Sequence, residues 1–227
     1  YGRSLTICEE LGNKSGMGSS LNNIGNVHWN KGDYDKALDY LGRSLAIREE
    51  LGDKYGMGYS LDNIGTVHKN KGDYNKALDY YGRSLAIQEE LGDKRGMLIT
   101  LNNIGIVHSN KGDYDKTAEY LEKSFSIQKE IGLKELETTT YLYLSYKHLG
   151  KDYDVKEIHS LIKDAENIEF EVNFRLHQLL EDKSYLEAAY KQVQDNVSAM
   201  DDELAKKFLS YPIPKAVVEE YNKVFKK

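Results

Sequence analysis

Residues 21–34 read LNNIGNVHWNKGDY, and the same stretch returns as LDNIGTVHKNKGDY at 61–74 and as LNNIGIVHSNKGDY at 101–114. The similarity extends beyond these residues, because 13–52 and 53–92 differ at only nine of 40 positions. Self-similarity at a fixed spacing of this size is typical of repeat architectures, in which each unit is one supersecondary element. The 40-residue period therefore indicates a repeat protein.

Apolar spacing within one unit predicts two helices. The apolar residues of the first segment fall at steps of three and four, on one helix face: Met17, Leu21, Ile24 and Val27. A similar pattern runs from about residue 34 to residue 51. Gly32 suits the left-handed conformation that ends a helix, and Asp33 can cap the helix that follows. Each unit is therefore predicted to be a helical hairpin.

A glycine recurs in the middle of the first predicted helix of every unit, at Gly25, Gly65 and Gly105. Glycine costs about 1 kcal/mol relative to alanine there, so its recurrence predicts a close approach by the paired helix. Small residues of the second helix are the expected counterparts: Ala37, Ala77, Ser44 and Ser84. One hairpin cannot bury both of its apolar faces, so the hairpins are expected to stack into an all-α solenoid.

The two ends of the chain are less regular than the three full units. We predict the second helix of a truncated repeat, three full units, two degenerate units and a C-terminal capping helix, at 1–12, 13–52, 53–92, 93–132, 133–166, 167–210 and 211–227 respectively. Pro212 and Pro214 are expected to end the preceding helix, and a final amphipathic helix is expected at 215–226.

The repeated residues resemble the tetratricopeptide repeat family. In the first full unit the match consists of Leu21, Ile24, Gly25, Gly32, Tyr34, Ala37, Leu41 and Ser44. The unit length resembles the long subclass found in kinesin light chains, in spindle-orientation adaptors and in bacterial and archaeal signalling proteins. His28 stands where the family usually has Tyr, and the proline that commonly ends shorter units is missing. The resemblance implies a right-handed α-solenoid with a concave groove that binds peptides.

Differences between the units form a stripe on the first helix, because their offsets of 3, 7 and 10 residues lie on one side. The stripe consists of Ser19, Tyr59 and Ile99; Asn22, Asp62 and Asn102; Asn26, Thr66 and Ile106; and Trp29, Lys69 and Ser109. In tetratricopeptide arrays the equivalent stripe lines the groove, so the resemblance implies that these residues contact the ligand. Trp29 is either an aromatic anchor for the ligand or an exposed replacement at a tolerant site.

Two sets of asparagines run beside this stripe: Asn23, Asn63 and Asn103, and Asn30, Asn70 and Asn110. An amide offers both a donor and an acceptor, so a ladder of amides can pair with the backbone of an extended peptide. The first set matches the family asparagine that contacts peptide backbone. The alternative is that these amides bond within the array and tie adjacent first helices together, or, for the second set, that they cap the turn.

The family's clamp for a C-terminal carboxylate needs basic residues in the groove, and only Lys69 lies in the stripe. We therefore expect a mixed groove that takes an amphipathic helix or an apolar-rich extended segment.

Composition excludes several other classes of protein. The 227 residues carry 31 basic and 37 acidic side chains, a net charge of −6 that argues against nucleic-acid binding. The sequence contains no run of about 18 or more apolar residues, so no membrane-spanning helix is predicted. The single cysteine, Cys8, fits a reducing compartment and hence a cytoplasmic location.

No constellation in the sequence predicts catalysis, a cofactor or a metal. The four histidines at 28, 68, 108 and 148 lie one repeat apart. Neighbouring helix axes are about 8–10 Å apart, whereas zinc ligands converge to about 2 Å from the ion. We expect these histidines to pack between paired helices, with one ring nitrogen bonded locally.

The sequence thus predicts a non-enzymatic scaffold that binds a peptide or helical segment of a partner protein. The alternative is a regulatory or sensor region of a larger signalling protein, which relays peptide or domain binding to an output domain. A third reading is end-to-end self-association through the open face of residues 1–12.

Overall fold

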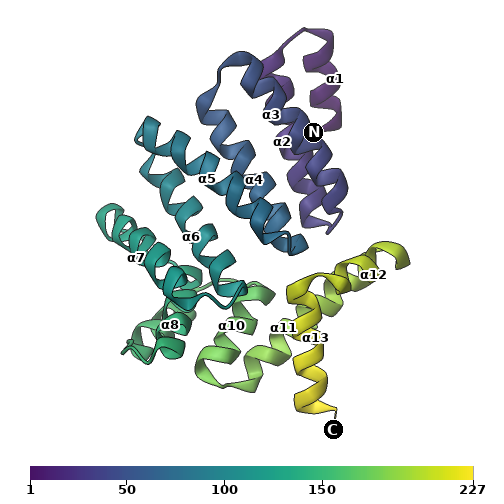
Figure 1. Ribbon diagram of the computed structural model, residues 1–227. Helices are drawn as coiled ribbons and strands as arrows, with labels where there is room; N and C mark the ends of the chain where they lie inside the picture. Colours follow the sequence, from purple (N-terminus) through teal and green to yellow (C-terminus); the bar gives the residue numbers. More distant parts are fainter. Residues whose placement is uncertain (227) are drawn as a thin grey trace. The chain divides into compact units, whose positions relative to one another are not determined.

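The computed structural model describes residues 1–226, whose regular elements are thirteen α-helices (Figure 1). They are α1 (Gly2–Glu10), α2 (Lys14–Asn30), α3 (Tyr34–Leu51), α4 (Lys54–Lys71), α5 (Tyr74–Leu91), α6 (Lys94–Asn110), α7 (Tyr114–Ile131), α8 (Leu136–Leu149), α9 (Val155–Asp164), α10 (Phe170–Leu180), α11 (Lys183–Ser198), α12 (Asp202–Ser210) and α13 (Pro212–Phe225). The predicted all-α class of helical hairpins is confirmed.

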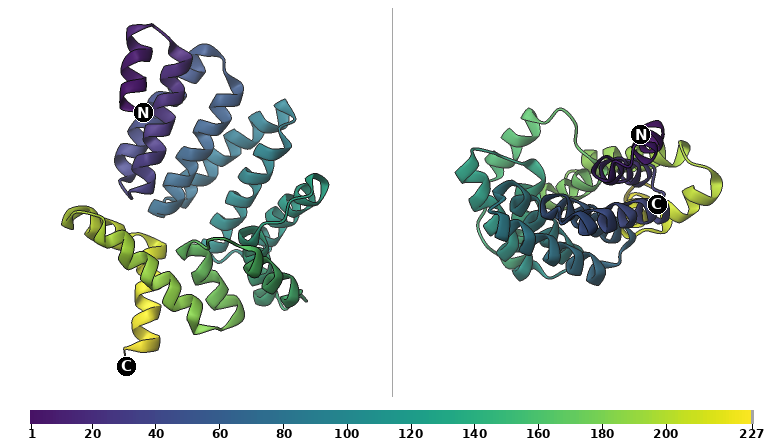
Figure 2. Two further views of the ribbon diagram at one scale, coloured as in Figure 1. Left: turned by 180° about the vertical axis from the view of Figure 1, so that it is seen from behind. Right: turned by 90° about the horizontal axis from the view of Figure 1, so that it is seen from above.

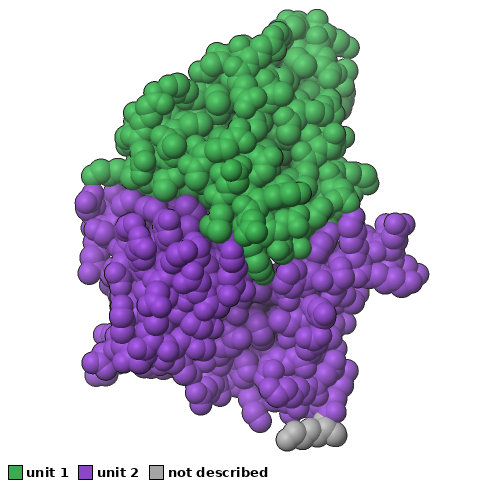
Figure 3. Space-filling view, in the orientation of Figure 1, with its two compact units in different colours: residues 1–100 green, residues 101–227 purple. Residues whose placement is uncertain are grey.

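The helices fall into two compact units, Tyr1–Thr100 and Leu101–Lys227, coloured separately in Figure 3. The division lies within α6. In the first unit α2 pairs with α3 and α4 pairs with α5, while α1 packs on α2 and α3 packs on α4. Figures 1 and 2 show these helices as consecutive antiparallel hairpins. The hairpins α2–α3 and α4–α5 lie within residues 13–52 and 53–92 respectively.

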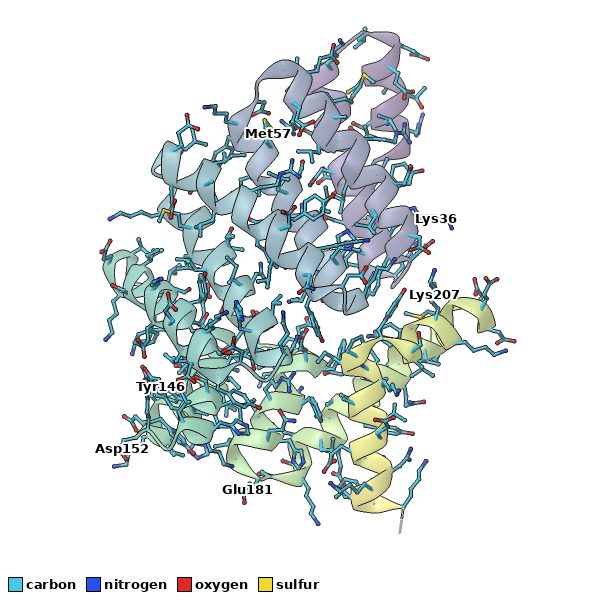
Figure 4. The ribbon with its side chains drawn as sticks, in the orientation of Figure 1. Lys36, Met57, Tyr146, Asp152, Glu181 and Lys207 are labelled. Atoms are coloured by element: carbon cyan, nitrogen blue, oxygen red, sulfur yellow. The ribbon has the colours of Figure 1, made fainter. Side chains whose placement is uncertain are left out.

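The turns between helices have the conformation that the sequence predicted. Gly32 has a φ of 76°, in the left-handed region that glycine enters without strain. The Asp33 carboxylate accepts a hydrogen bond from the backbone N–H of Lys36, which Figure 4 labels, and so caps α3. At the next turn the Asp53 carboxylate accepts from the backbone N–H of Gly56 at 2.9 Å.

The glycines in the middle of the first helices are required by close packing, as predicted. A Cβ atom at Gly25 would lie 2.7 Å from Leu41 Cγ, and one at Gly65 would lie 2.7 Å from Tyr81 Cε1. Of the expected small counterparts, Ala37 does lie beside Gly25, since its backbone oxygen would be 3.3 Å from that Cβ atom, but the nearest atoms belong to the large side chains of Leu41 and Tyr81. The Ser44 hydroxyl on α3 donates a hydrogen bond to the backbone carbonyl of Gly18 on α2 at 2.8 Å, and so links the two helices.

The second unit has its own core, formed mainly by α8 and α10 together with α6 and α7. Its buried apolar residues include Ile106, Leu121, Tyr141, Leu142, Leu144, Ile158, Val172, Leu176 and Leu179. α8 packs against α7, α9 and α10, and α10 packs against α11. This unit therefore departs from the regular order of hairpins in the first.

Two expectations for the C-terminal region need correction. The segment 167–210 contains three helices, α10 to α12, rather than one hairpin. The final helix begins at Pro212 rather than after Pro214. Proline is compatible with the first turn of a helix, because the backbone N–H groups there have no partner within the helix.

Among the described residues, no helix is long and apolar enough to cross a membrane.

Candidate functional site

A pocket of about 250 Å³ lies in the first unit between the first helices of two successive hairpins, α2 and α4, with the end of α3 beside them. Its lining residues are Ser19, Asn22, Asn23, Arg48, Asp53, Tyr55, Gly56, Tyr59 and Ser60. Met57, labelled in Figure 4, marks the same part of α4. Ser19, Asn22, Asn23 and Tyr59 belong to the surface that the sequence predicted to bind a ligand.

Arg48 holds one side of this pocket. One terminal nitrogen, Nη1, donates to the Asp53 carboxylate, and Nη2 donates to Ser19 Oγ at 2.8 Å. Its Nε atom is buried without a partner among residues 1–226. A Cβ atom at Gly56 would lie 2.7 Å from Nε, so glycine is needed there for the arginine to fit. The backbone N–H of Gly56 and the guanidinium of Arg48 lower the pKa of the Asp53 carboxyl.

Two exposed tyrosines stand at the edge of the pocket. The hydroxyl oxygens of Tyr55 and Tyr59 lie 3.2 Å apart, and their rings meet edge to face with centroids 5.0 Å apart. The hydrogen bond to Tyr55, together with burial, raises the pKa of Tyr59 to about 12, so its hydroxyl stays protonated at neutral pH. Tyr59 and Ile99 occupy equivalent positions of successive 40-residue repeats, and each is 43% exposed. This edge therefore presents apolar and aromatic surface to solvent.

The first asparagine set has two different environments in this unit. Asn63 Nδ2 donates to Asn22 Oδ1 at 3.0 Å, which is the bond between adjacent first helices that the alternative interpretation anticipated. Asn23 is half-buried in the pocket wall and has no side-chain hydrogen bond among residues 1–226. In the second unit, Asn103 is half-buried.

The second asparagine set is not uniform either. Asn30 is exposed, and Asn70 is half-buried. In the second unit, Asn110 Oδ1 accepts a hydrogen bond from Nη2 of the buried Arg175 at 2.5 Å. At Asn110 the amide oxygen therefore serves a contact within the fold.

At the equivalent position one repeat later, three side chains bond to one another. Gln88 Nε2 lies 2.9 Å from Asp62 Oδ2, and Thr100 Oγ1 lies 2.8 Å from both Asp62 Oδ1 and Gln88 Oε1. Asp62 is 8% exposed. Burial raises the pKa of the Asp62 carboxyl to about 6, although the hydrogen bonds from Thr100 and Gln88 oppose the shift. The prediction that Asp62 lines an open groove is wrong, because its oxygens face this network.

Other residues of the predicted stripe are less accessible than expected. Ile106 is fully buried in the core of the second unit, so its assignment to a groove is also wrong. Asn102 is buried and donates to Glu137 at 3.4 Å, and Lys69 and Ser109 are buried. Ile106 belongs to a core cluster with Ala118 and Leu121 of α7, so its side chain packs inside the second unit.

The remaining stripe positions are half-buried: Asn26, Thr66 and Trp29. Thr66 Oγ1 lies 3.0 Å from the hydroxyl of Tyr81, a hydrogen bond within the second hairpin.

The repeated histidines pack between paired helices, but the predicted local bond of a ring nitrogen is found at His68 and is wrong for His28 and His108, whose Nδ1 atoms are buried without a hydrogen-bond partner among residues 1–226. The rings of His28, His68 and His108 stack on Tyr40, Tyr80 and Tyr120, with centroids 5.4, 5.5 and 5.6 Å apart respectively. His68 Nδ1 lies 3.2 Å from the Asp73 carboxylate, and burial lowers the pKa of His68. His148 differs, because its ring stacks on Tyr114 at 3.9 Å.

Sequence reasoning missed Arg48 and Asp53 because they lie outside the first helices, and it missed Tyr55 because this position is outside the stripe of offsets 3, 7 and 10. The signal was present, since Arg48 is one of the nine differences between the two most similar units and aligns with Gln88.

A sequence model of the tetratricopeptide repeat matches residues 1–50, 16–90 and 56–130. No curated protein sequence matches the chain significantly.

Several solved structures have a similar fold. The crystal structure of the apo form of RapI is 13% identical, with a TM-score of 0.68 over 95% of this chain and 90% of that one. Aspartyl phosphate phosphatase F from Bacillus subtilis is 17% identical, with a TM-score of 0.58, and the match covers 93% of this chain but 49% of that protein. A third similar structure is that of a putative kinesin light chain from Podosopora anserina, whose TPR-like repeats are nearly identical to one another. It is 17% identical to this chain, with a TM-score of 0.52 over 92% of this chain and 97% of that one.

Proposed function

Because the chain belongs to the tetratricopeptide repeat family, we propose that it is a non-enzymatic scaffold that binds a peptide or helical segment of a partner protein. The pocket between α2 and α4 carries this proposal, since it combines hydrogen-bonding side chains with an exposed aromatic edge. Among the pocket residues, no hydroxyl is paired with a histidine base, so the wall offers groups for binding rather than for nucleophilic chemistry.

The aromatic edge is the expected source of affinity. Tyrosine is enriched among residues that dominate binding energy, because it buries a large rigid surface and keeps a polar tip. Tyr55 and Tyr59 already contact each other, and both stand on α4. Little ordering is therefore required when a ligand arrives, which lowers the cost of binding.

The amides beside the tyrosines are the expected source of orientation. Asn23 has a free donor and a free acceptor within the described chain, so it can pair with the backbone of an extended segment. Asn22 uses its oxygen for Asn63 and keeps its amide hydrogens. The first unit thus provides both apolar contact area and backbone recognition in one place.

The test is selection from a library of random peptides displayed on phage, followed by affinity measurements on synthetic copies of the enriched peptides. Tyr59→Ser introduces the residue that the preceding unit carries at Ser19. We expect it to weaken binding about tenfold or more without lowering the melting temperature, since truncating an interface hot spot typically costs that much. Arg83→Ser is the matched control, because the Arg83 side chain is 47% exposed on a second helix.

Light scattering during the same titrations checks that the chain keeps one oligomeric state. The proposal fails if no peptide is enriched, or if Tyr59→Ser and Arg83→Ser weaken binding equally.

A further inference from the structure

The polar groups of the pocket are unequally satisfied, because its one carboxylate, Asp53, has a partner for each oxygen, whereas several donors of the pocket have none. Asp53 uses one oxygen for the Gly56 N–H and the other for Arg48. Asn22 Oδ1 accepts from Asn63, and Ser19 Oγ accepts from Arg48. Asn23 keeps a free oxygen, but the charged group of the pocket with unused hydrogens is the cation Arg48, so a ligand group that supplies acceptors complements it.

The donors that remain lie on Arg48 and the two asparagines of the pocket wall. A guanidinium has five N–H donors, and the contacts to Asp53 and Ser19 use one hydrogen on each terminal nitrogen. The amide hydrogens of Asn22 and Asn23 have no hydrogen-bond acceptor among residues 1–226. These donors converge from α2 and from the end of α3.

From this geometry we propose that the pocket receives an acidic side chain of the bound segment, with Arg48 as its charge partner. This inference rests on the proposed function and adds the chemistry of one ligand residue. Asp53 holds one terminal nitrogen of the guanidinium, and only the neutral hydroxyl of Ser19 contacts the other. A carboxylate that takes the place of Ser19 gains a charge-assisted hydrogen bond, which is stronger than a bond to a hydroxyl.

The neighbouring repeat lacks the arginine on which this proposal rests. There Gln88 replaces Arg48 and Asp62 replaces Asn22, so the equivalent wall carries a carboxylate rather than a cation. Thr100 replaces Ser60 and bonds to both Asp62 and Gln88. A second carboxylate at that position would meet a buried acid instead of an arginine.

The proposal differs from recognition of a chain terminus. Arg48 comes from a second helix and sits beside the aromatic edge of Tyr55 and Tyr59, so the bound segment can continue past the pocket along this edge. An internal aspartate or glutamate therefore fits the arrangement.

The experiment compares peptides enriched from the random library by the full chain and by its Arg48→Gln variant. Glutamine occupies this position in the next two 40-residue repeats, as Gln88 and Gln128, so the variant is compatible with the fold. We expect one acidic position to be enriched by the unchanged chain and not by Arg48→Gln. On a synthetic peptide, replacing that acid by its amide should weaken binding about tenfold or more to the unchanged chain, and about twofold or less to Arg48→Gln.

Amidation of the peptide's C-terminus separates the two sources of a carboxylate. Unchanged affinity after amidation supports an acidic side chain as the ligand group. The inference is overturned if amidation of the C-terminus weakens binding and replacement of the acidic side chain by its amide does not. The inference also fails if enriched peptides lack an acid, or if the acid matters equally to both variants. Neither result affects the proposed function as long as Tyr59→Ser still weakens binding and Arg83→Ser does not.

Discussion

Two equivalent sites in the compact unit of residues 1–100, one repeat apart, differ in the contacts that their side chains make. The open junction consists of Asn22, Arg48 and Ser60, which line a pocket. The closed junction consists of the residues 40 positions later, Asp62, Gln88 and Thr100, which bond to one another. Three linked substitutions thus distinguish a repeat boundary whose side chains line a pocket from one whose side chains bond to one another.

The closed junction also explains why Asp62 is buried without a cation. The hydroxyl of Thr100 has one hydrogen but lies within hydrogen-bond distance of both Asp62 and Gln88 Oε1. If Asp62 is protonated it donates to Thr100, Thr100 donates to Gln88, and Gln88 donates back to Asp62. The neutral acid therefore completes the network, in agreement with its raised pKa.

The largest effect on stability is expected from a core substitution in α4, because this helix contributes residues to both junctions. Leu61 is 1% exposed on α4, so Leu61→Ala should lower the free energy of unfolding by about 2–5 kcal/mol through loss of contacts and a cavity. Leu91→Ala is the control, because Leu91 is 45% exposed and should change stability by less than about 0.5 kcal/mol. Urea denaturation measures both, and equal effects would contradict the assignment of the core.

A smaller effect, with the opposite sign, is expected in the closed junction. Asp62→Asn keeps the network, because the asparagine amide can donate to Thr100 while its oxygen accepts from Gln88. At pH 8 the variant should be more stable by about 1–3 kcal/mol, since the pKa difference between about 6 and 3.8 corresponds to a penalty of that order for the buried anion.

The pH dependence gives the sign of this effect. The folded state holds the Asp62 proton more tightly than the unfolded state, so its contribution is fully present below pH 3.8 and is lost as pH rises to about 6. The difference in unfolding free energy between Asp62→Asn and the unchanged chain should therefore grow across this window and level off above it. A difference independent of pH would show that Asp62 does not titrate there.

In the open junction, Gly56→Ala should act mainly on the pocket. Its Cβ atom would lie 2.6 Å from Arg48 Cδ, so the arginine must move, at a cost of about 1 kcal/mol. Gly58→Ala is the matched control, since the nearest atom to its Cβ would be 3.8 Å away. Thermal unfolding should rank Gly56→Ala below Gly58→Ala, and the reverse order would mean that Arg48 is not packed on Gly56.

The smallest effect on stability is expected for Arg48→Gln. The bond to Asp53 is lost, but the pair is partly exposed and glutamine fits the same position elsewhere, so the change should be within about 1 kcal/mol. Calorimetry can check this. A larger loss would give Arg48 a structural role instead of the binding role assigned to it.

The sequence predicted the hairpins, their turns and the glycine contacts because each depends on local spacing or on backbone conformation, as Gly32 and Gly25 illustrate. It also assigned Tyr59 and Asn23 to one ligand-binding surface, and both line the pocket. It could not predict that Asp62 is enclosed, since enclosure depends on Gln88 and Thr100, which lie far away in the sequence. The irregular C-terminal helices were harder still, because no second copy of them exists for comparison.

The most direct test closes the open junction with the residues of the closed one. The triple variant Asn22→Asp, Arg48→Gln and Ser60→Thr reproduces Asp62, Gln88 and Thr100 one repeat earlier. We predict that it folds with an unchanged or higher melting temperature at pH 5 and binds the selected peptides at least about tenfold more weakly. A triple variant that folds and binds them with unchanged affinity would contradict the account.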